Sequence, residues 1–336
     1  MIIKENIPLK DFTTFRIGGP ANYFAIARNV DDVKEASKFA HDKVLQMFVL
    51  GSGSNILVSD DGFSGLVLKM EIGGIVLEEG GIIAAGAGVH WDDLVAYAVE
   101  NGLYGLENLS LIPGTVGAAP VQNIGAYGTE AKDVISFVEA FDRESDEIRT
   151  FSPNECGFDY RTSLFKKPEG KKYIITRVGF ALKGNGELNA KYKDVQDHLA
   201  TNPGTELNLK NLRSIIIGIR TRKLPDMAKY GTAGSFFKNP IVPKDRVEEL
   251  KKTYQDIILY PAGDMVKVSA AWLIDRVAGL RGFRDGHVGV YEKQALIPIN
   301  FGEATALEIK KLTAKIFSAV KEKTGIELER EVEFVG

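Results

Sequence analysis

The chain has 336 residues, of which 44% are hydrophobic and 26% are charged, and its formal net charge is −3. This composition is typical of a globular protein and excludes disordered and collagen-like chains. The lack of a basic excess argues against nucleic-acid binding, and no apolar run approaches the ~18 residues of a membrane helix. The single cysteine, Cys156, excludes an internal disulfide and a multi-cysteine metal site. The four histidines show no metal-ligand spacing, so we expect no metal.

The length and the first residues give two further expectations. At ~100–200 residues per domain, the chain is predicted to form two or three domains. The N-terminal sequence MIIKENIPLKDF lacks the apolar core and cleavage site of a signal peptide, which predicts a cytoplasmic protein.

The first hundred residues predict two helices and a strand. Residues 31–43 open with aspartate and carry apolar side chains at helical spacing. Residues 91–101 place apolar side chains on one face and stop at Gly102. The nearly continuous apolar run 45–50 predicts a strand.

The middle of the chain, residues 66–190, is rich in predicted strands and contains a single strong helix. Residues 134–141 are apolar with glutamate and serine interruptions, and residues 173–182 are long and rich in β-branched side chains. Both patterns are typical of strands.

The C-terminal third mixes helices and strands. Helices are predicted over 269–278 and 305–324, and a short strand over 295–299. The second helix opens with Thr305 and Glu308, which have the spacing of a capping box. Periodicity breaks near 70 and near 224–230, so we expect an α+β protein with three lobes.

Residues 50–55, LGSGSN, follow the first apolar strand directly. A strand followed by a glycine-rich loop lets successive backbone N–H groups hold a phosphate. The loop is neither GxGxxG nor a Walker loop, and a plain turn is an equally good reading of it alone.

A second glycine-rich stretch runs from Ile112 to Gly128 and includes Thr115, Gln122 and Asn123. Its small residues allow close approach of a flat or extended ligand, and its neutral amides can pair with the edge of a heterocycle. A purely structural loop is the alternative, although loops of this length are uncommon without a function.

Two later segments contain polar side chains among apolar ones. Arg161 lies in the aromatic segment FDYRTSLFK and needs an anionic partner, either Asp159 or a substrate carboxylate. Ser235 lies in GTAGSFFKNP, which lacks the GxSxG pattern and a nearby histidine. This context argues against the nucleophile of a catalytic triad and leaves open a serine that donates a proton.

The last residues, ELEREVEFV, alternate apolar and acidic side chains and predict a strand. Periodicity alone does not distinguish Glu329, Glu331 and Glu333 from one another or from a solvated face. The basic residues Arg220, Arg222 and Lys223 are likewise suited either to phosphate binding or to a solvated surface.

Taken together, these segments resemble the UDP-N-acetylenolpyruvoylglucosamine reductase family. The resemblance is carried, in the family's order, by LGSGSN, GLENLSLIPGTVGAAPVQNIGAYG, FDYRTSLFK, GIRTRKLPD, GTAGSFFKNP and LEREVEFVG. It implies a two-lobe FAD-binding domain of the vanillyl-alcohol-oxidase type and a C-terminal α+β substrate domain. The implied boundaries are 1–69 and 70–223 for the two FAD lobes, 224–326 for the substrate domain and 327–336 for a strand that returns to the active site.

The resemblance also assigns residues to roles. It implies that FAD is bound non-covalently by Ser52, Gly53, Ser54, Asn55, Gly114, Thr115, Gly117, Ala118, Asn123 and Gly125. It places Arg161, Ser235 and Glu331 in the family's catalytic positions, which selects one of the three glutamates. Tyr192, Lys223 and Asn239 match substrate contacts, and Tyr192 marks the longer of the family's two types.

The implied reaction uses NADPH to reduce FAD and then reduces the enolpyruvyl ether of UDP-N-acetylglucosamine enolpyruvate to UDP-N-acetylmuramate, a peptidoglycan precursor. Two alternatives stay open on the sequence. Another flavin oxidase of the same fold would leave Ser235 and Glu331 unexplained. A non-catalytic nucleotide-sugar binding protein would not need Arg161, Ser235 and Glu331 together.

Overall fold

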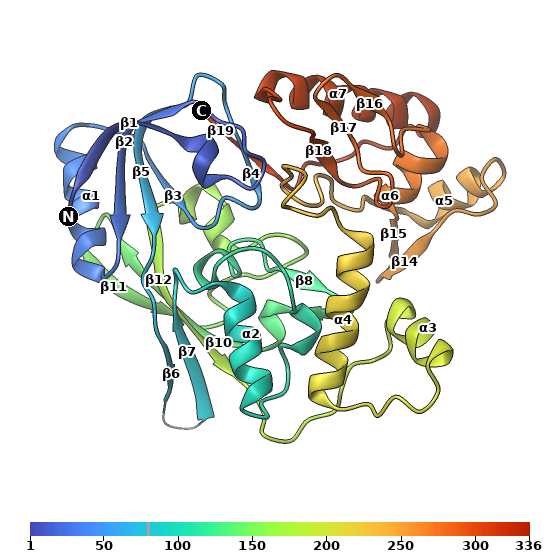
Figure 1. Ribbon diagram of the computed structural model, residues 1–336, viewed down its shortest axis with the longest axis horizontal. Coiled ribbons are helices and arrows are strands. Elements are labelled where there is room, and N and C mark those ends of the chain that lie inside the picture. Colours follow the sequence, from blue (N-terminus) through green and yellow to red (C-terminus); the bar gives the residue numbers. More distant parts are fainter. Residues whose placement is uncertain (79–80) are drawn as a thin grey trace. The chain divides into compact units, whose positions relative to one another are not determined.

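The computed structural model describes residues 1–78 and 81–336 (Figure 1). The described chain forms two compact units. The first unit contains Met1–Ile7, Ala21–Ser52 and Ser64–Arg222, and the second contains Pro8–Pro20, Gly53–Phe63 and Lys223–Gly336. The chain therefore leaves the first unit for the last time next to the predicted boundary at 223, whereas the finer division into lobes stays a prediction.

The first unit begins with a four-stranded sheet in the order β1-β2-β5-β3, in which β3 and β5 are parallel. Its helix α1 starts at an Asn29 side chain that accepts a hydrogen bond from the Asp32 N–H, and it buries Val33, Ala36 and Ala40. The elements are β1 (Ile3–Pro8), β2 (Pro20–Ala27), α1 (Val30–Asp42), β3 (Met47–Leu50) and β5 (Phe63–Met70).

A five-stranded antiparallel sheet, in the order β11-β10-β12-β7-β6, forms the rest of the first unit's framework. Helix α2 buries Trp91, Leu94 and Ala98 in the core of this unit. The elements are β6 (Ile75–Leu77), β7 (Ile82–Gly86), α2 (Trp91–Glu100), β8 (Gly125–Ala126), β9 (Thr129–Glu130), β10 (Ile135–Asp142), β11 (Glu147–Phe151) and β12 (Tyr173–Ala181). The predicted strands at 134–141 and 173–182 and the predicted helix at 91–101 are confirmed within two residues.

Two helices close the first unit, α3 (Lys193–Thr201) and α4 (Leu209–Lys223), and neither was predicted. Figure 1 shows α4 beside α2, and Arg213 on α4 pairs with Asp92 on α2 at 2.7 Å. The β-branched run 215–217 and the following Gly218 give α4 a weak local helix propensity. Burial of Leu212, Ile216 and Ile219 in the unit's tertiary packing overrides it.

The second unit packs its own hydrophobic core around helix α7, with Phe236, Phe237, Ile309 and Ile316 at its centre. The predicted capping box is confirmed, because the Thr305 and Glu308 side chains accept hydrogen bonds from each other's backbone N–H groups. The elements are β4 (Ile56–Val58), β13 (Ile241–Pro243), α5 (Lys244–Lys251), β14 (Leu259–Ala262), β15 (Met265–Val268), α6 (Ala270–Trp272), β16 (Arg284–Asp285), β17 (Val288–Val290), β18 (Pro298–Asn300), α7 (Ala306–Thr324) and β19 (Glu333–Val335).

Three predicted elements of the second unit differ from the structure. The helix expected over 269–278 is α-helical only over Ala270–Trp272 and continues as a π-helix over Leu273–Val277. The strand expected over 295–299 starts later, at Pro298, because the Ile297 N–H donates to the Gln294 carbonyl in a turn. The last strand, β19, is short because the residues before it pair with a different partner, described below.

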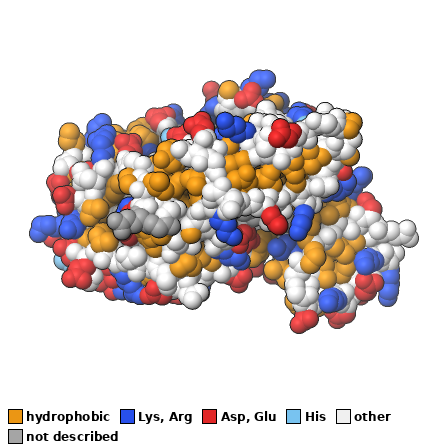
Figure 2. All heavy atoms as spheres, turned by 90° about the horizontal axis from the view of Figure 1, so that it is seen from below, with side chains coloured by type: hydrophobic (Ala, Val, Ile, Leu, Met, Phe, Trp, Pro, Cys, Tyr) orange, Lys and Arg blue, Asp and Glu red, His pale blue; other side chains and the backbone are white. Residues whose placement is uncertain are grey.

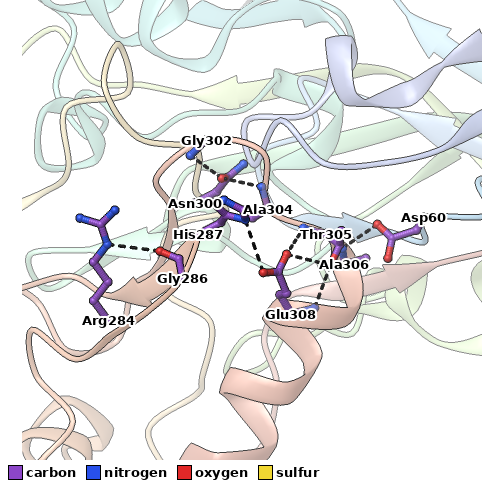
Figure 3. A network of polar contacts seen from close by, with 10 residues as sticks. All are labelled: Asp60, Arg284, Gly286, His287, Asn300, Gly302, Ala304, Thr305, Ala306 and Glu308. Carbon is purple, nitrogen blue, oxygen red and sulfur yellow. Dashed lines mark hydrogen bonds and ion pairs between the residues drawn. The ribbon is translucent and has the colours of Figure 1, made fainter.

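The segment 53–63 joins the second unit although it lies in sequence between strands of the first. Its strand β4 pairs in parallel with β19 at the end of the chain, with Ile56 opposite Glu333. Asp60, further along the segment, accepts hydrogen bonds from the backbone N–H groups of Ala306 and Leu307 at the start of α7 (Figure 3). A carboxylate at this position satisfies unpaired N–H groups and complements the helix dipole.

Two general expectations from composition can be compared with the structure. Among the described residues, no helix is both long and apolar enough to cross a membrane. On the face drawn in Figure 2, Lys and Arg side chains are interspersed with Asp and Glu and do not form a continuous basic area. This pattern matches the near balance of 42 basic and 45 acidic residues.

Candidate active site

The loop after β3 is divided between the two units, with Gly51 and Ser52 in the first and Gly53 to Asn55 in the second. Within the first unit, Gly51 lies against Thr115, because a Cβ on Gly51 would be 2.9 Å from the Thr115 Oγ1. The Lys69 Nζ on β5 donates to the Gly51 carbonyl at 2.7 Å. Burial lowers the pKa of this Lys69 ammonium. The structure thus brings the two predicted glycine loops together and adds Lys69, which sequence analysis missed because it lies inside a strand.

The Ile112–Gly128 stretch runs close to the backbone that follows β7. The N–H of Gly117 donates to the Ala87 carbonyl at 2.9 Å, and a Cβ on Gly117 would be only 2.5 Å from the Ala87 Cβ. Thr115 is 2% exposed, and Gly114 has a φ of 141°, which side chains disfavour. The Ala118 N–H donates to the Thr115 carbonyl and closes a tight turn.

A partly buried ion pair supports the start of this stretch. Leu111 has a φ of 58°, and its N–H donates to the Asp92 carboxylate at 2.5 Å. The same carboxylate receives two hydrogen bonds from Arg213, at 2.7 and 2.9 Å. Burial by itself would raise the pKa of the Asp92 carboxyl, but the bonds from Arg213 and Leu111 hold it below its usual value.

These features test whether the first unit fits a nucleotide cofactor. Gly51 and Gly117 leave no room for a side chain, and Gly114 adopts a backbone conformation that favours glycine. A half-buried lysine lies beside the first loop. Closely approaching backbone with one added cation is what a diphosphate group requires. The residues present therefore fit the diphosphate of FAD.

Arg161 lies at a tight turn, in which Asp159 and Thr162 exchange backbone hydrogen bonds. Its φ is 55°, and its guanidinium donates to the carbonyl oxygens of Gly125 at 2.8 Å and Asn123 at 3.4 Å. The guanidinium also lies over the ring of Tyr160, 5.5 Å from its centroid. Arg161 is therefore held by main-chain dipoles at the end of the second glycine-rich stretch.

Asn123 is fully buried and organises this corner of the first unit. Its side-chain amide donates to the Glu130 carboxylate at 2.9 Å and the Asp159 carbonyl at 3.3 Å, and its oxygen accepts from the Lys132 N–H. A Cβ on Gly125 would meet the Arg161 Nη1 at 3.2 Å. Asn123 and Gly125 thus support Arg161, in addition to the contact with FAD that the resemblance implies for them.

Ser235 and Glu331 come together through main-chain pairing in the second unit. The segment 236–238 runs antiparallel to 329–331, with Phe237 opposite Arg330. The Glu331 N–H donates to the Phe236 carbonyl at 2.8 Å, and the Lys238 N–H donates to the Glu329 carbonyl at 2.9 Å. This pairing explains why the final strand is short: the chain leaves one partner at 331 and joins β4 at 333.

Both side chains sit in partly buried positions on this pairing. Ser235 and Glu331 are each partly exposed, and the residue that follows each of them, Phe236 or Val332, is buried. The preceding Gly234 has a φ of 71°, which turns the chain into the pairing. The main chain thus places the backbones of Ser235 and Glu331 close together, and a hydroxyl and a carboxyl are groups that proton transfer can use.

The predicted substrate residues lie in three places. The Tyr192 side chain is 38% exposed and packs edge-on against the ring of Tyr127, with 5.1 Å between centroids. Arg220 on α4 hydrogen-bonds Tyr127, and burial raises the pKa of the Tyr127 hydroxyl and lowers that of Arg220.

Lys223 is the last residue of α4. The Asn239 Oδ1 accepts from the Ala270 N–H at 2.9 Å and so holds the start of α6 in the second unit.

Comparisons with known protein families identify two matching regions. Residues 21–152 match a family described as an FAD binding domain. Residues 226–335 match the C-terminal domain of UDP-N-acetylenolpyruvoylglucosamine reductase. The two regions together cover most of the chain and fall on either side of the transition at 222–223.

Relatives over the full length carry the same description. UDP-N-acetylenolpyruvoylglucosamine reductases from Pseudomonas putida and Pseudomonas aeruginosa are 43% and 42% identical to this chain, over 98% of it and 97% and 98% of their own lengths. The one from Flavobacterium johnsoniae is 40% identical over 100% of both chains. The crystal structure of the enzyme from Thermus caldophilus matches with a TM-score of 0.71 at 27% identity, and covers 100% of both chains.

Proposed function

The chain belongs to the UDP-N-acetylenolpyruvoylglucosamine reductase family, and we propose that Arg161, Ser235 and Glu331 carry out its chemistry. The proposed reaction is the NADPH-dependent reduction of UDP-N-acetylglucosamine enolpyruvate to UDP-N-acetylmuramate in the cytoplasm. The observation that supports it best is the main-chain pairing that brings Ser235 and Glu331 together in the domain that matches the family's C-terminal region.

FAD would be held by the two glycine loops, and when bound it supplies the hydride that adds to C3 of the enolpyruvyl group. The first loop offers Ser52, Gly53, Ser54 and Asn55. The second offers the backbone around Gly114, Thr115, Gly117 and Ala118. Asn123 and Gly125 lie beyond these and support Arg161, so their contact with the cofactor is the least direct.

Arg161 is suited to stabilise negative charge that develops on the substrate beside its carboxylate. Two of its donors are occupied by the carbonyls of Asn123 and Gly125, which fix the plane of the guanidinium. A guanidinium presents five N–H donors in a planar fork, a geometry that matches the oxygens of a carboxylate. Charge-assisted hydrogen bonds of this kind are roughly twice as strong as neutral ones.

Ser235 is proposed to give its hydroxyl proton to C2 of the reduced substrate. A serine hydroxyl is a weak acid, so the step needs a strongly basic substrate carbon and shielding from water. Phe236 and Val332, which follow Ser235 and Glu331 in the sequence, are buried in the core of the second unit. Glu331, in its protonated form, would add a second hydrogen bond to the developing charge.

Tyr192, Lys223 and Asn239 are proposed to bind the nucleotide-sugar part of the substrate. Tyr192 presents a partly exposed aromatic ring, Lys223 a cation at the end of a helix, and Asn239 an amide beside the start of α6. An aromatic face, a cation and an amide together match a uracil base, a diphosphate and sugar hydroxyls.

The proposal is tested by following the flavin spectrum of the purified protein without oxygen. We expect a yellow protein that loses its colour on addition of NADPH and regains it on addition of UDP-N-acetylglucosamine enolpyruvate. The Ser235→Ala variant should be bleached by NADPH at the normal rate but should not be reoxidised by the substrate. Ser235→Cys should restore reoxidation, because a thiol is also a proton donor.

Each other outcome contradicts part of the proposal. A protein that stays colourless when FAD is supplied contradicts the flavin assignment. Colour that returns only with oxygen would identify an oxidase of the same fold. Near-normal reoxidation of Ser235→Ala by the substrate removes Ser235 from the mechanism.

A further inference from the structure

The segment 55–59 lies along the last residues of the chain and is bonded to them at each step. The Glu333 N–H donates to the Asn55 carbonyl at 3.1 Å, β4 pairs with β19, and the Ser59 N–H donates to the Val335 carbonyl at 2.7 Å. The same segment is held at its far end, where Asp60 binds the start of α7 (Figure 3). The segment is therefore fixed from Asn55, where it meets Glu331, as far as Asp60.

Asn55 also contacts the end of this strand pairing through its side chain. Its Nδ2 donates to the main-chain carbonyl of Glu331 at 3.2 Å. On the other side of the same residue, the Glu331 N–H donates to the carbonyl of Phe236, which directly follows Ser235. The main chain of Glu331 is thus hydrogen-bonded at its carbonyl by Asn55 and at its N–H by Phe236.

We propose that Asn55 is a positioning residue that orients the Glu331 carboxyl by fixing the Glu331 carbonyl. This proposal rests on the catalytic role proposed above for Glu331, and it adds a second role to Asn55 besides its expected contact with FAD. A main chain fixed at both N–H and C=O leaves Glu331 only its side-chain torsions. The Asn55 amide therefore helps to fix the direction in which the Glu331 side chain leaves the main chain.

The size of the effect follows from the geometry that catalysis needs. Displacement of a reacting group by about 1 Å costs up to roughly 100-fold in rate. Removing the Asn55 amide frees one of the two main-chain anchors of Glu331 and leaves the other in place. We therefore expect a roughly 10- to 100-fold slower reaction with substrate, and a smaller effect on the reaction with NADPH, which does not involve Glu331.

The test uses three variants of the full-length protein, each saturated with FAD. Asn55→Ala removes the donor, and Asn55→Gln keeps an amide that can still donate. Asp60→Ala is the matched control, because it loosens the same segment from α7 without touching Glu331. Bleaching by NADPH and reoxidation by UDP-N-acetylglucosamine enolpyruvate are measured separately, the second as a function of pH.

A further readout does not depend on the flavin. Backbone hydrogen exchange of residues 331–335 is measured by mass spectrometry on the protein freed of FAD. We expect faster exchange there in Asn55→Ala than in the wild type or in Asn55→Gln. In the flavin experiments, Asn55→Ala should shift the pH at which reoxidation is half-maximal, and Asn55→Gln should recover much of the rate.

The outcomes separate this proposal from the function it rests on. A wild-type protein that does not react with NADPH and substrate contradicts the proposed function itself. If the wild type reacts and Asn55→Ala keeps its rate and pH dependence, Asn55 does not position Glu331. If Asp60→Ala slows reoxidation and shifts the pH dependence as much as Asn55→Ala, the segment has only a general structural role, and the proposal is wrong.

Discussion

Arg161 and Glu331 are held in opposite ways, one by its side chain and the other by its main chain. In the first unit, the Arg161 guanidinium donates directly to the carbonyls of Asn123 and Gly125. In the second unit, the N–H and C=O of Glu331 are bonded to Phe236 and Asn55. A change beside Arg161 therefore moves the functional group itself, whereas a change beside Glu331 acts through the backbone and alters its direction.

The largest effect is expected from Arg161→Lys, which keeps the charge but replaces the fork of donors with a single ammonium. One nitrogen cannot bind both anchoring carbonyls and still offer a fixed donor to the substrate. We expect reoxidation by substrate to slow by roughly 10²- to 10³-fold, comparable to the loss of one stabilising donor at similar sites. Stopped-flow absorbance of the flavin measures this, and a loss below about threefold would contradict the role of the fork.

A smaller effect is expected from Gly125→Ala, which disturbs the anchor and leaves Arg161 intact. The added Cβ would lie 2.9 Å from the Glu130 Cγ and 3.2 Å from the Arg161 Nη1, so one of these side chains must move. We expect roughly tenfold slower reoxidation by substrate. The loss is smaller than for Arg161→Lys because the guanidinium is displaced but still present.

The control for Gly125→Ala is Gly184→Ala in the same unit, where a Cβ would meet nothing within 4 Å. Its reoxidation rate should match the wild type. Equal rates for both variants would show that a side chain added at Gly125 does not displace Arg161 from its working position.

The smallest effect is expected from Asp92→Asn. This variant tests the ion pair between Asp92 and Arg213, which supports the start of the second glycine-rich stretch. The folded protein holds the pKa of Asp92 below its usual value of about 3.9. The carboxylate therefore contributes stability above that pH, and the contribution is lost as the pH falls through the lower folded pKa. At pH 7 we expect the free energy of unfolding of the variant to be about 1 kcal/mol lower than that of the wild type.

Urea unfolding at pH 7 and at progressively lower pH measures this difference. The two proteins should converge as the pH falls below about 3.9, because the wild-type carboxylate then becomes protonated. A difference that grows with falling pH would contradict the assigned direction of the pKa shift. FAD affinity provides a second readout, since Asp92 also binds the Leu111 N–H at the start of the second glycine loop.

Elements with strong local signals were predicted well. The helix over 305–324 has a capping box at its start and Gly325 in the left-handed conformation at its end, and both are confirmed. The helices at 31–43 and 91–101 are likewise confirmed: Asn29 caps the first, and both bury their apolar face. These features involve residues a few positions apart, so the sequence contains all the information they need.

Features that depend on distant residues were not predicted. Nothing local indicates that segment 53–63 joins the second unit, or that 236–238 pairs with 329–331. The resemblance selected Glu331 among three glutamates, but no spacing in the sequence indicated the Asn55 contact with it. Lys69 was not predicted because it lies in a largely apolar strand. Its partner, the Gly51 carbonyl, is brought to it only by the fold.

The pairing of β4 with β19 has a consequence for how the protein is made. The contact between Asn55 and Glu331 spans 276 positions of the chain. During translation, residues 53–63 therefore leave the ribosome long before their partners exist. The second unit cannot complete its fold until residues 331–335 have been made, and a fragment that begins at 224 would lack two of the segments that it needs.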